Sequence, residues 1–96
     1  MLRILLNDGL DKKAISNLEL LGFDVDTNHY DIEDLKEKIK KIDCIVIRSA
    51  TKIRRELIDE AIKGGNLKLI IRGGVGVDNI DVQYAEQNGI NVRNTP

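Results

Sequence analysis

The sequence has few of the residues that mark several large classes of protein. A single cysteine, Cys44, cannot form an internal disulfide, and no Cys and His residues stand at the spacing of a zinc site. Aromatic residues are limited to Phe23, Tyr30 and Tyr84, so the chain lacks the stacking platforms that hold single-stranded nucleic acid. Its core must therefore be aliphatic, and Pro96, the only proline, interrupts no element.

An excess of charge of one sign is also missing. The chain carries 15 Lys and Arg against 16 Asp and Glu, a net charge of −1, which gives nucleic acid or an anionic membrane no reason to bind. No apolar run approaches the ~18 residues of a membrane span, and the first residues do not resemble a signal peptide. We expect a small cytoplasmic domain with neither kind of partner.

Short apolar runs alternate with amphipathic stretches along the chain. Helices are predicted after Asp11, after Asp31, around 57–62 and after Asp81, because a capping residue or an apolar stripe at helical spacing marks each one. Strands are predicted at 4–6, 23–25, 44–47, 67–71 and 90–93. The run 44–47 is apolar throughout, which favours a strand covered on both faces.

This alternation predicts an α/β fold with a parallel sheet and helices on both of its faces. We expect a flavodoxin-like, three-layer sandwich with five strands in the order 2-1-3-4-5. The pattern ends as the fifth strand finishes, without the helix that usually covers it, so the sandwich is expected to be truncated. In such sheets ligands gather at the carboxyl ends of the strands.

Two arginines, Arg48 and Arg72, follow directly on two of the apolar runs. A guanidinium at a strand end suits two-point contact with a carboxylate or phosphate. The glycines after Arg72 leave backbone N–H groups uncovered, which favours an anion cradle. The pattern therefore predicts a small anionic ligand held by both arginines and the turn. The alternative, that each arginine pairs with an acid such as Asp8 or Asp78, stays open.

The segment 74–79, Gly-Val-Gly-Val-Asp-Asn, begins like the glycine fingerprint of dinucleotide-binding proteins. Its sixth position is Asn79, where the fingerprint needs a glycine or alanine, and no acid stands about 20 residues downstream. We therefore do not interpret this segment as a cofactor fingerprint.

Three ordered motifs nevertheless resemble one family. The segments 46–53 (VIRSATKI), 67–81 (LKLIIRGGVGVDNID) and 88–96 (NGINVRNTP) are similar, with matching spacing, to the D-isomer-specific 2-hydroxyacid dehydrogenases. Within that family, the motifs Arg-Ser-Ala-Thr and Gly-Val-Asp-Asn-Ile-Asp are most similar to those of the D-3-phosphoglycerate dehydrogenases. The resemblance implies an enzyme that oxidises a D-2-hydroxyacid by hydride transfer to NAD, as in the first step of serine biosynthesis.

The resemblance also implies roles for individual residues. Gly74 would offer its backbone N–H to the substrate carboxylate. The substrate-binding residues would be Arg48, Ser49, Arg72, Gly73 and Gly74, and the cofactor-binding residues would be Val75 and Asn79. Two positions depart from the family pattern. Gly73 stands where alanine is usual, and Arg54 stands where relatives place a capping Thr or Ser, which puts the start of the helix around 57–62 in doubt.

The same resemblance implies a longer parent, in which residues 1–96 are the N-terminal part of the substrate-binding domain. The NAD-binding domain and the catalytic arginine, glutamate and histidine would lie beyond Pro96. We therefore expect no catalytic residue and no metal ligand in this chain, and no turnover by it alone. The partners would be a small anionic 2-hydroxyacid or 2-oxoacid and further copies of the parent, as a homodimer or homotetramer.

The alternative is a stand-alone small-anion-binding or regulatory module of the same fold. A phosphorylatable receiver needs an acid where this chain has Arg48, and a flavodoxin needs a phosphate loop that residues 7–12 do not supply. Other conspicuous residues are given structural roles. We expect an exposed loop residue far from the motifs (His29), a core residue (Cys44) and a solvated helix face (Lys36, Lys38, Lys40 and Lys41).

Overall fold

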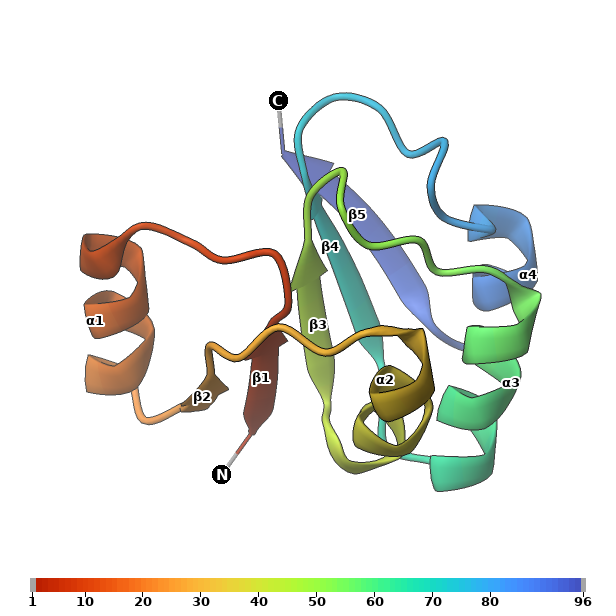
Figure 1. Cartoon of the computed structure of the whole chain (residues 1–96), viewed down its shortest axis with the longest axis horizontal. Coiled ribbons are helices and arrows are strands. Elements are labelled where there is room, and N and C mark those ends of the chain that lie inside the picture. The colour runs from red at the N-terminus through yellow and green to blue at the C-terminus, as the bar shows by residue number, and fades with distance from the viewer. Residues whose placement is uncertain (1, 96) are drawn as a thin grey trace.

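The sheet in the computed structural model, which describes residues 2–95, has five parallel strands in the order β2-β1-β3-β4-β5 (Figure 1). Each neighbouring pair of strands is parallel. The predicted strand order is therefore confirmed. The strands are β1 (Arg3–Leu6), β2 (Asp24–Asp26), β3 (Cys44–Ile47), β4 (Leu69–Gly73) and β5 (Asn91–Thr95).

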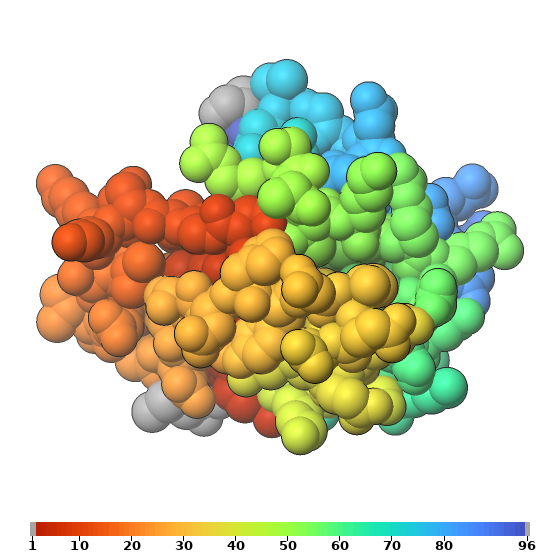
Figure 2. Space-filling view, in the orientation of Figure 1, coloured from red at the N-terminus to blue at the C-terminus, as the bar shows by residue number. Residues whose placement is uncertain are grey.

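Helices lie on both sides of the sheet, but unequally. One face carries α2 (Ile32–Lys38) with the 3-10 turn that continues it (Ile39–Lys41), α3 (Arg55–Gly64) and α4 (Val82–Gln87). On the other side α1 (Lys12–Leu20) lies near β2 and projects from the body of the molecule (Figure 2). None of the helices within residues 2–95 has the length and apolar character needed to cross a membrane. Pro96, the last residue of the segment that resembles the family at 88–96, lies outside the described residues.

The core lies between the sheet and α2, α3 and α4. Ile45, Ile47 and Ile70 point from β3 and β4 into this layer and are completely buried. The helices and the 3-10 turn contribute mainly aliphatic side chains to the same cluster, namely Leu35, Ile39, Leu57, Ile58 and Ala61. Each fully buried side chain of this kind contributes about 1.5–3 kcal/mol, so this layer fixes the strands whose ends carry the site.

The opposite face of the sheet is only partly covered. Along β3, Ile45 and Ile47 are buried whereas Cys44 and Val46 are half-buried, so the prediction of cover on both faces is wrong for residues 2–95. A groove of about 660 Å³ separates this face from α1. Cys44 lines the groove instead of joining the core, although burial raises the pKa of its thiol to about 11. The apolar lining of the groove also includes Leu18, Phe23, Leu69 and Ile71.

Two helix starts are capped in different ways. Asp11 caps α1 as predicted, since its Oδ1 accepts a hydrogen bond from a backbone N–H of the first turn at 2.8 Å. Asp81 stands at the N-cap of α4, but its carboxylate accepts the N–H of Arg55, the first residue of α3, at 2.9 Å. Because a later segment supplies this cap, α3 begins properly even with Arg54 at its own N-cap.

Candidate functional site at the carboxyl edge of the sheet

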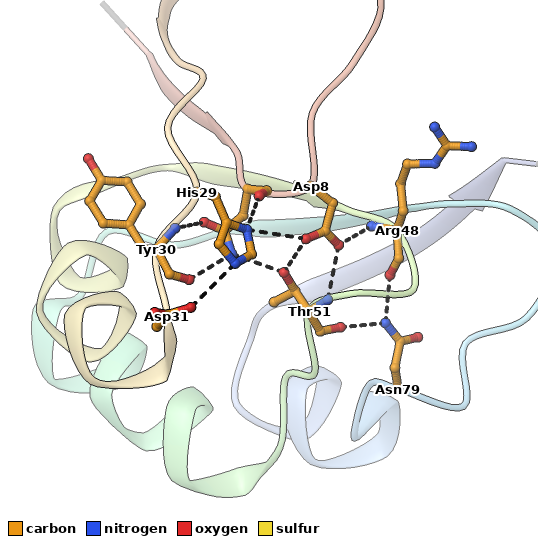
Figure 3. A network of polar contacts seen from close by, with 8 residues as sticks. Asp8, His29, Tyr30, Asp31, Arg48, Thr51 and Asn79 are labelled. Atoms are coloured by element: carbon orange, nitrogen blue, oxygen red, sulfur yellow. Dashed lines mark hydrogen bonds and ion pairs between the residues drawn. The ribbon is translucent and has the colours of Figure 1, made fainter.

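The segment 48–51, Arg-Ser-Ala-Thr, follows β3 at the carboxyl edge of the sheet and is held from two sides (Figure 3). On one side lies the carboxylate of Asp8, which follows β1. Its Oδ2 accepts the N–H of Arg48 at 2.7 Å and the N–H of Thr51 at 3.1 Å, and its Oδ1 accepts the Thr51 hydroxyl at 2.5 Å. The side chain of Asp8 is only 3% exposed, so water hardly competes for these bonds.

On the other side lies the carboxamide of Asn79, from the loop between β4 and α4. Its Nδ2 donates to the C=O of Arg48 at 2.8 Å and to the C=O of Thr51 at 2.6 Å. Its Oδ1 accepts a longer bond, 3.4 Å, from Nε of Arg72. Both amide hydrogens of Asn79 are used within the chain, and its predicted contact with a cofactor stays a prediction.

A buried asparagine connects this segment to the loop before α2. Asn7, which is 1% exposed, donates from Nδ2 to Oγ1 of Thr51 at 2.9 Å and to the C=O of Tyr30 at 3.1 Å. Nδ1 of His29 lies 2.6 Å from the C=O of Asn7, so this nitrogen carries a hydrogen, and 3.8 Å from Asp8. The prediction that His29 lies far from the motifs is therefore wrong, although its side chain is half exposed.

The side chain of Arg48 points away from this polar network (Figure 3). The arginines that form ion pairs within residues 2–95 are Arg3, Arg54 and Arg93, so Arg48 does not pair with Asp8, which binds its backbone N–H instead. Arg48 also lines a hollow of about 430 Å³. The lining of the hollow is Leu10, Val46, Arg48, Gly73, Gly74 and Thr95. A positive group without an acidic partner is therefore available to a ligand.

Arg72 leaves the sheet on the opposite face. The strand register places it beside Ile47, whose side chain faces the helices, whereas Arg48 stands one residue later, on the open face. Nη1 of Arg72 donates to the C=O of Gly73 at 2.5 Å, and no acid within residues 2–95 pairs with it. The two arginines therefore leave neighbouring strand ends on opposite faces, and the predicted convergence of both arginines and the glycine turn on one anion stays a prediction.

The turn after β4 offers backbone donors, but not the predicted one. The N–H of Gly74 donates to the C=O of Thr95 at 2.7 Å and is not free for a substrate. The N–H groups of Val75 and Gly76 have no acceptor within residues 2–95, and Nδ2 of Asn94 holds the C=O of Val75 at 3.1 Å. The side chain of Val75 is 77% exposed at the rim of the edge. Any anion that this turn binds through its backbone would therefore meet the N–H groups of Val75 and Gly76 and not that of Gly74.

The glycines of the turn differ in what surrounds them. A Cβ on Gly73 would make an ordinary contact with Cγ of Arg48 at 3.6 Å, so the alanine usual in the family would fit. Gly74 has φ +138°, and a Cβ there would overlap the guanidinium of Arg72. Ser49 is exposed beside Arg48 and is available to a ligand.

A comparison with known proteins decides the family. The model of the D-isomer specific 2-hydroxyacid dehydrogenase family, catalytic domain, matches residues 4–96. The chain belongs to this family. It is 47% identical over 96 residues to the D-3-phosphoglycerate dehydrogenase of Methanocaldococcus jannaschii, covering 100% of the chain and 18% of that protein. It is 44% identical over 97 residues to the hydroxypyruvate reductase of Thermotoga maritima, covering 98% of the chain and 30% of that protein.

Solved structures agree with this family assignment. The NAD+-bound 3-phosphoglycerate dehydrogenase of Entamoeba histolytica superimposes with a TM-score of 0.79 at 33% identity, covering 99% of this chain and 33% of that one. Across these three family members the chain spans between 18% and 33% of the relative's length. Within residues 2–95 no three His, Cys, Asp or Glu side chains are grouped so that they could hold a metal ion.

Proposed function

We propose that this chain is the substrate-binding part of an NAD-dependent D-2-hydroxyacid dehydrogenase that acts on D-3-phosphoglycerate. The chain belongs to the D-isomer specific 2-hydroxyacid dehydrogenase family. The observation that carries the proposal is that Arg48, whose guanidinium has no acidic partner within residues 2–95, lines a hollow on the carboxyl edge of the sheet. The N–H groups of Val75 and Gly76, which have no acceptor within residues 2–95 and follow Gly74 of the hollow in the chain, would add neutral donors for a second oxygen. A substrate with a carboxylate and a phosphate supplies anionic groups for these donors.

The residues of the chain would divide the work as follows. Arg48 and Ser49 hold one anionic group, and the turn holds the other through its free N–H groups. Arg72 shapes that turn through the C=O of Gly73, and it reaches the substrate only if that bond is exchanged. NAD, when bound, accepts the hydride from the carbon that bears the hydroxyl. Val75 offers an exposed apolar surface suited to the nicotinamide side, and the turn has no glycine fingerprint for the phosphates of NAD.

Titration calorimetry with D-3-phosphoglycerate tests the substrate contact. Replacing Arg48 with glutamine should weaken binding by about 10- to 100-fold, since a hydrogen bond to a charged group contributes about 1.5–3 kcal/mol. Lys63→Gln removes the same charge from an exposed site at the end of α3 and should leave binding unchanged. Equal affinities of the wild type and Arg48→Gln would overturn the assignment.

Turnover separates this proposal from a second one. The hollow and Arg48 lie entirely within residues 2–95, which favours anion binding without catalysis as the alternative. We expect the protein in its natural length to reduce NAD with D-3-phosphoglycerate, and the 96-residue chain by itself to bind without oxidising it. Oxidation by the 96-residue chain would refute the division of labour, and binding without turnover at natural length would favour the alternative.

The assembly and location also belong to the proposal. By similarity to its family, the protein in its natural length would form a homodimer or homotetramer and act in the cytoplasm. Analytical ultracentrifugation tests the assembly, and a monomer would contradict it. Fluorescence microscopy of a tagged protein tests the location, and a signal in another compartment would contradict it.

A further inference from the structure

Residues 48 and 51 have all four of their backbone polar groups bound by two side chains. The Asp8 carboxylate accepts both N–H groups, and the Asn79 carboxamide donates to both C=O groups. Asp8 comes from the end of β1 and Asn79 from the loop after β4, so the clamp joins segments on either side of β3 (Figure 3). Because both ends of the segment are fixed, the direction in which the Arg48 side chain leaves the strand is fixed as well.

We propose that Asp8 and Asn79 are positioning residues, which hold the 48–51 segment so that Arg48 and Ser49 present a fixed donor pair to the substrate anion. This inference rests on the proposed function. Neither side chain needs to touch the substrate, since both act through the backbone of residues 48 and 51. Oδ1 of Asn79 also accepts a hydrogen bond from Nε of Arg72. The same carboxamide therefore links the segment after β3 to the end of β4.

The contacts indicate that Asp8 works as a double acceptor. A single oxygen, Oδ2, receives both N–H groups, while Oδ1 receives only the Thr51 hydroxyl. Asparagine at position 8 can keep an oxygen in the place of Oδ2, where it accepts both N–H groups. It loses only the bond from the Thr51 hydroxyl, because its NH2 group stands in the place of Oδ1. Alanine removes all three bonds and frees the segment. Rescue by asparagine therefore separates a hydrogen-bond clamp from an effect of the negative charge on Arg48.

The experiment compares the affinity of the protein in its natural length for D-3-phosphoglycerate among the wild type, Asp8→Ala and Asp8→Asn. We expect Asp8→Ala to weaken binding by about tenfold and Asp8→Asn to recover most of that loss, because asparagine keeps an oxygen that can accept both N–H groups whereas alanine keeps none. Hydrogen exchange should show faster exchange of the Arg48 and Thr51 amides in Asp8→Ala. Asp11→Ala is the control for a general loss of stability, because it removes the cap of α1. It should bind D-3-phosphoglycerate as the wild type does.

A double-mutant cycle with Arg48→Gln tests whether Asp8 acts through Arg48. In the Arg48→Gln background, Asp8→Ala should cause a smaller further loss than in the wild type, since of the two side chains that it positions only Ser49 remains. If Asp8→Ala does not fold, Asn79→Ala, which releases the segment from the other side, replaces it and should show the same dependence on Arg48.

The outcomes separate the two proposals. A folded Asp8→Ala that binds as tightly as the wild type, or an equal loss in both backgrounds, would overturn the positioning role and leave the proposed function intact. Equal losses in Asp8→Ala and Asp8→Asn would overturn the clamp in favour of charge. A wild-type protein that does not bind D-3-phosphoglycerate would refute the proposed function itself.

Discussion

The neighbouring glycines at the end of β4 should respond oppositely to alanine. Gly74→Ala would force a side chain into φ +138°, a region that costs of order 1–3 kcal/mol. Its Cβ would also displace the guanidinium of Arg72, which loses bonds to Gly73 and Asn79 worth about 0.5–1.5 kcal/mol each. Together these effects predict a loss of about 2–6 kcal/mol in the free energy of unfolding.

Gly73→Ala is the matched control, since it adds the same methyl group one residue earlier. Its Cβ meets Cγ of Arg48 at an ordinary contact distance, 3.6 Å, without a positive φ. Reduced freedom of the unfolded chain should then stabilise the protein by about 0.4–1 kcal/mol.

Thermal unfolding followed by circular dichroism measures both variants. A loss of 1 kcal/mol lowers Tm by roughly 4–8 °C in a domain of this size, so Gly74→Ala should unfold on the order of 10 °C or more below the wild type. Gly73→Ala should unfold at or slightly above the wild-type temperature. If the two variants share one Tm, both the strain of the positive φ at Gly74 and the obstruction by Arg72 are refuted.

Three further predictions follow from buried and titrating groups. Thr51→Val should cost about 1–3 kcal/mol in urea unfolding because Asn7 and Asp8 lose a buried partner, whereas Thr51→Ser should cost clearly less; equal costs would contradict the network. Burial, reinforced by Asp43, raises the pKa of the Cys44 thiol to about 11, so iodoacetamide at pH 8 should alkylate the folded protein on the order of 100-fold more slowly than the unfolded chain. Burial alone would raise the pKa of Asp26, but bonds from Tyr30, Asn28 and Lys38 outweigh it and lower that pKa to about 2. The carboxylate therefore stabilises the fold above the unfolded pKa of about 3.9, and this stabilisation disappears as the pH falls through about 2; Asp26→Asn should be destabilising at pH 7 and neutral near pH 2.

Much of the fold could be predicted from local patterns. Short apolar runs such as 44–47 predict the strands, and Asp11 predicts the start of α1, because both depend on neighbours in the sequence. The cover of β3 could not be predicted in the same way. An apolar run indicates that a strand can be buried, but it does not indicate which of its faces another element covers.

The positions of Arg48 and Arg72 at two strand ends could be predicted, but the faces on which their side chains lie could not. Arg48 and Arg72 do stand at adjacent strand ends, but the strand register puts them on opposite faces, and register is not readable from an arginine after each run. The occupied N–H of Gly74 likewise depends on Thr95, which only tertiary pairing brings near.

The buried network of Asn7, Asp8 and Thr51 was not predicted. A signal for it was present, since two polar residues, Asn7 and Asp8, directly follow the first apolar run. Polar side chains at that place must find partners when the strand end is buried. Their partners, Thr51 and Tyr30, lie 23 residues or more away along the chain and could not be assigned from spacing.

The capping of α3 by Asp81 means that the first amide of this helix, that of Arg55, is bound by a side chain 26 residues later in the chain. During synthesis this one N–H group would be bound by water until the chain had been extended to Asp81. Position 54 is thereby released from the need for a small polar side chain and can carry an arginine that pairs with the same acid at 3.2 Å. A substitution at Asp81 would therefore be felt first in a different helix from the one it precedes.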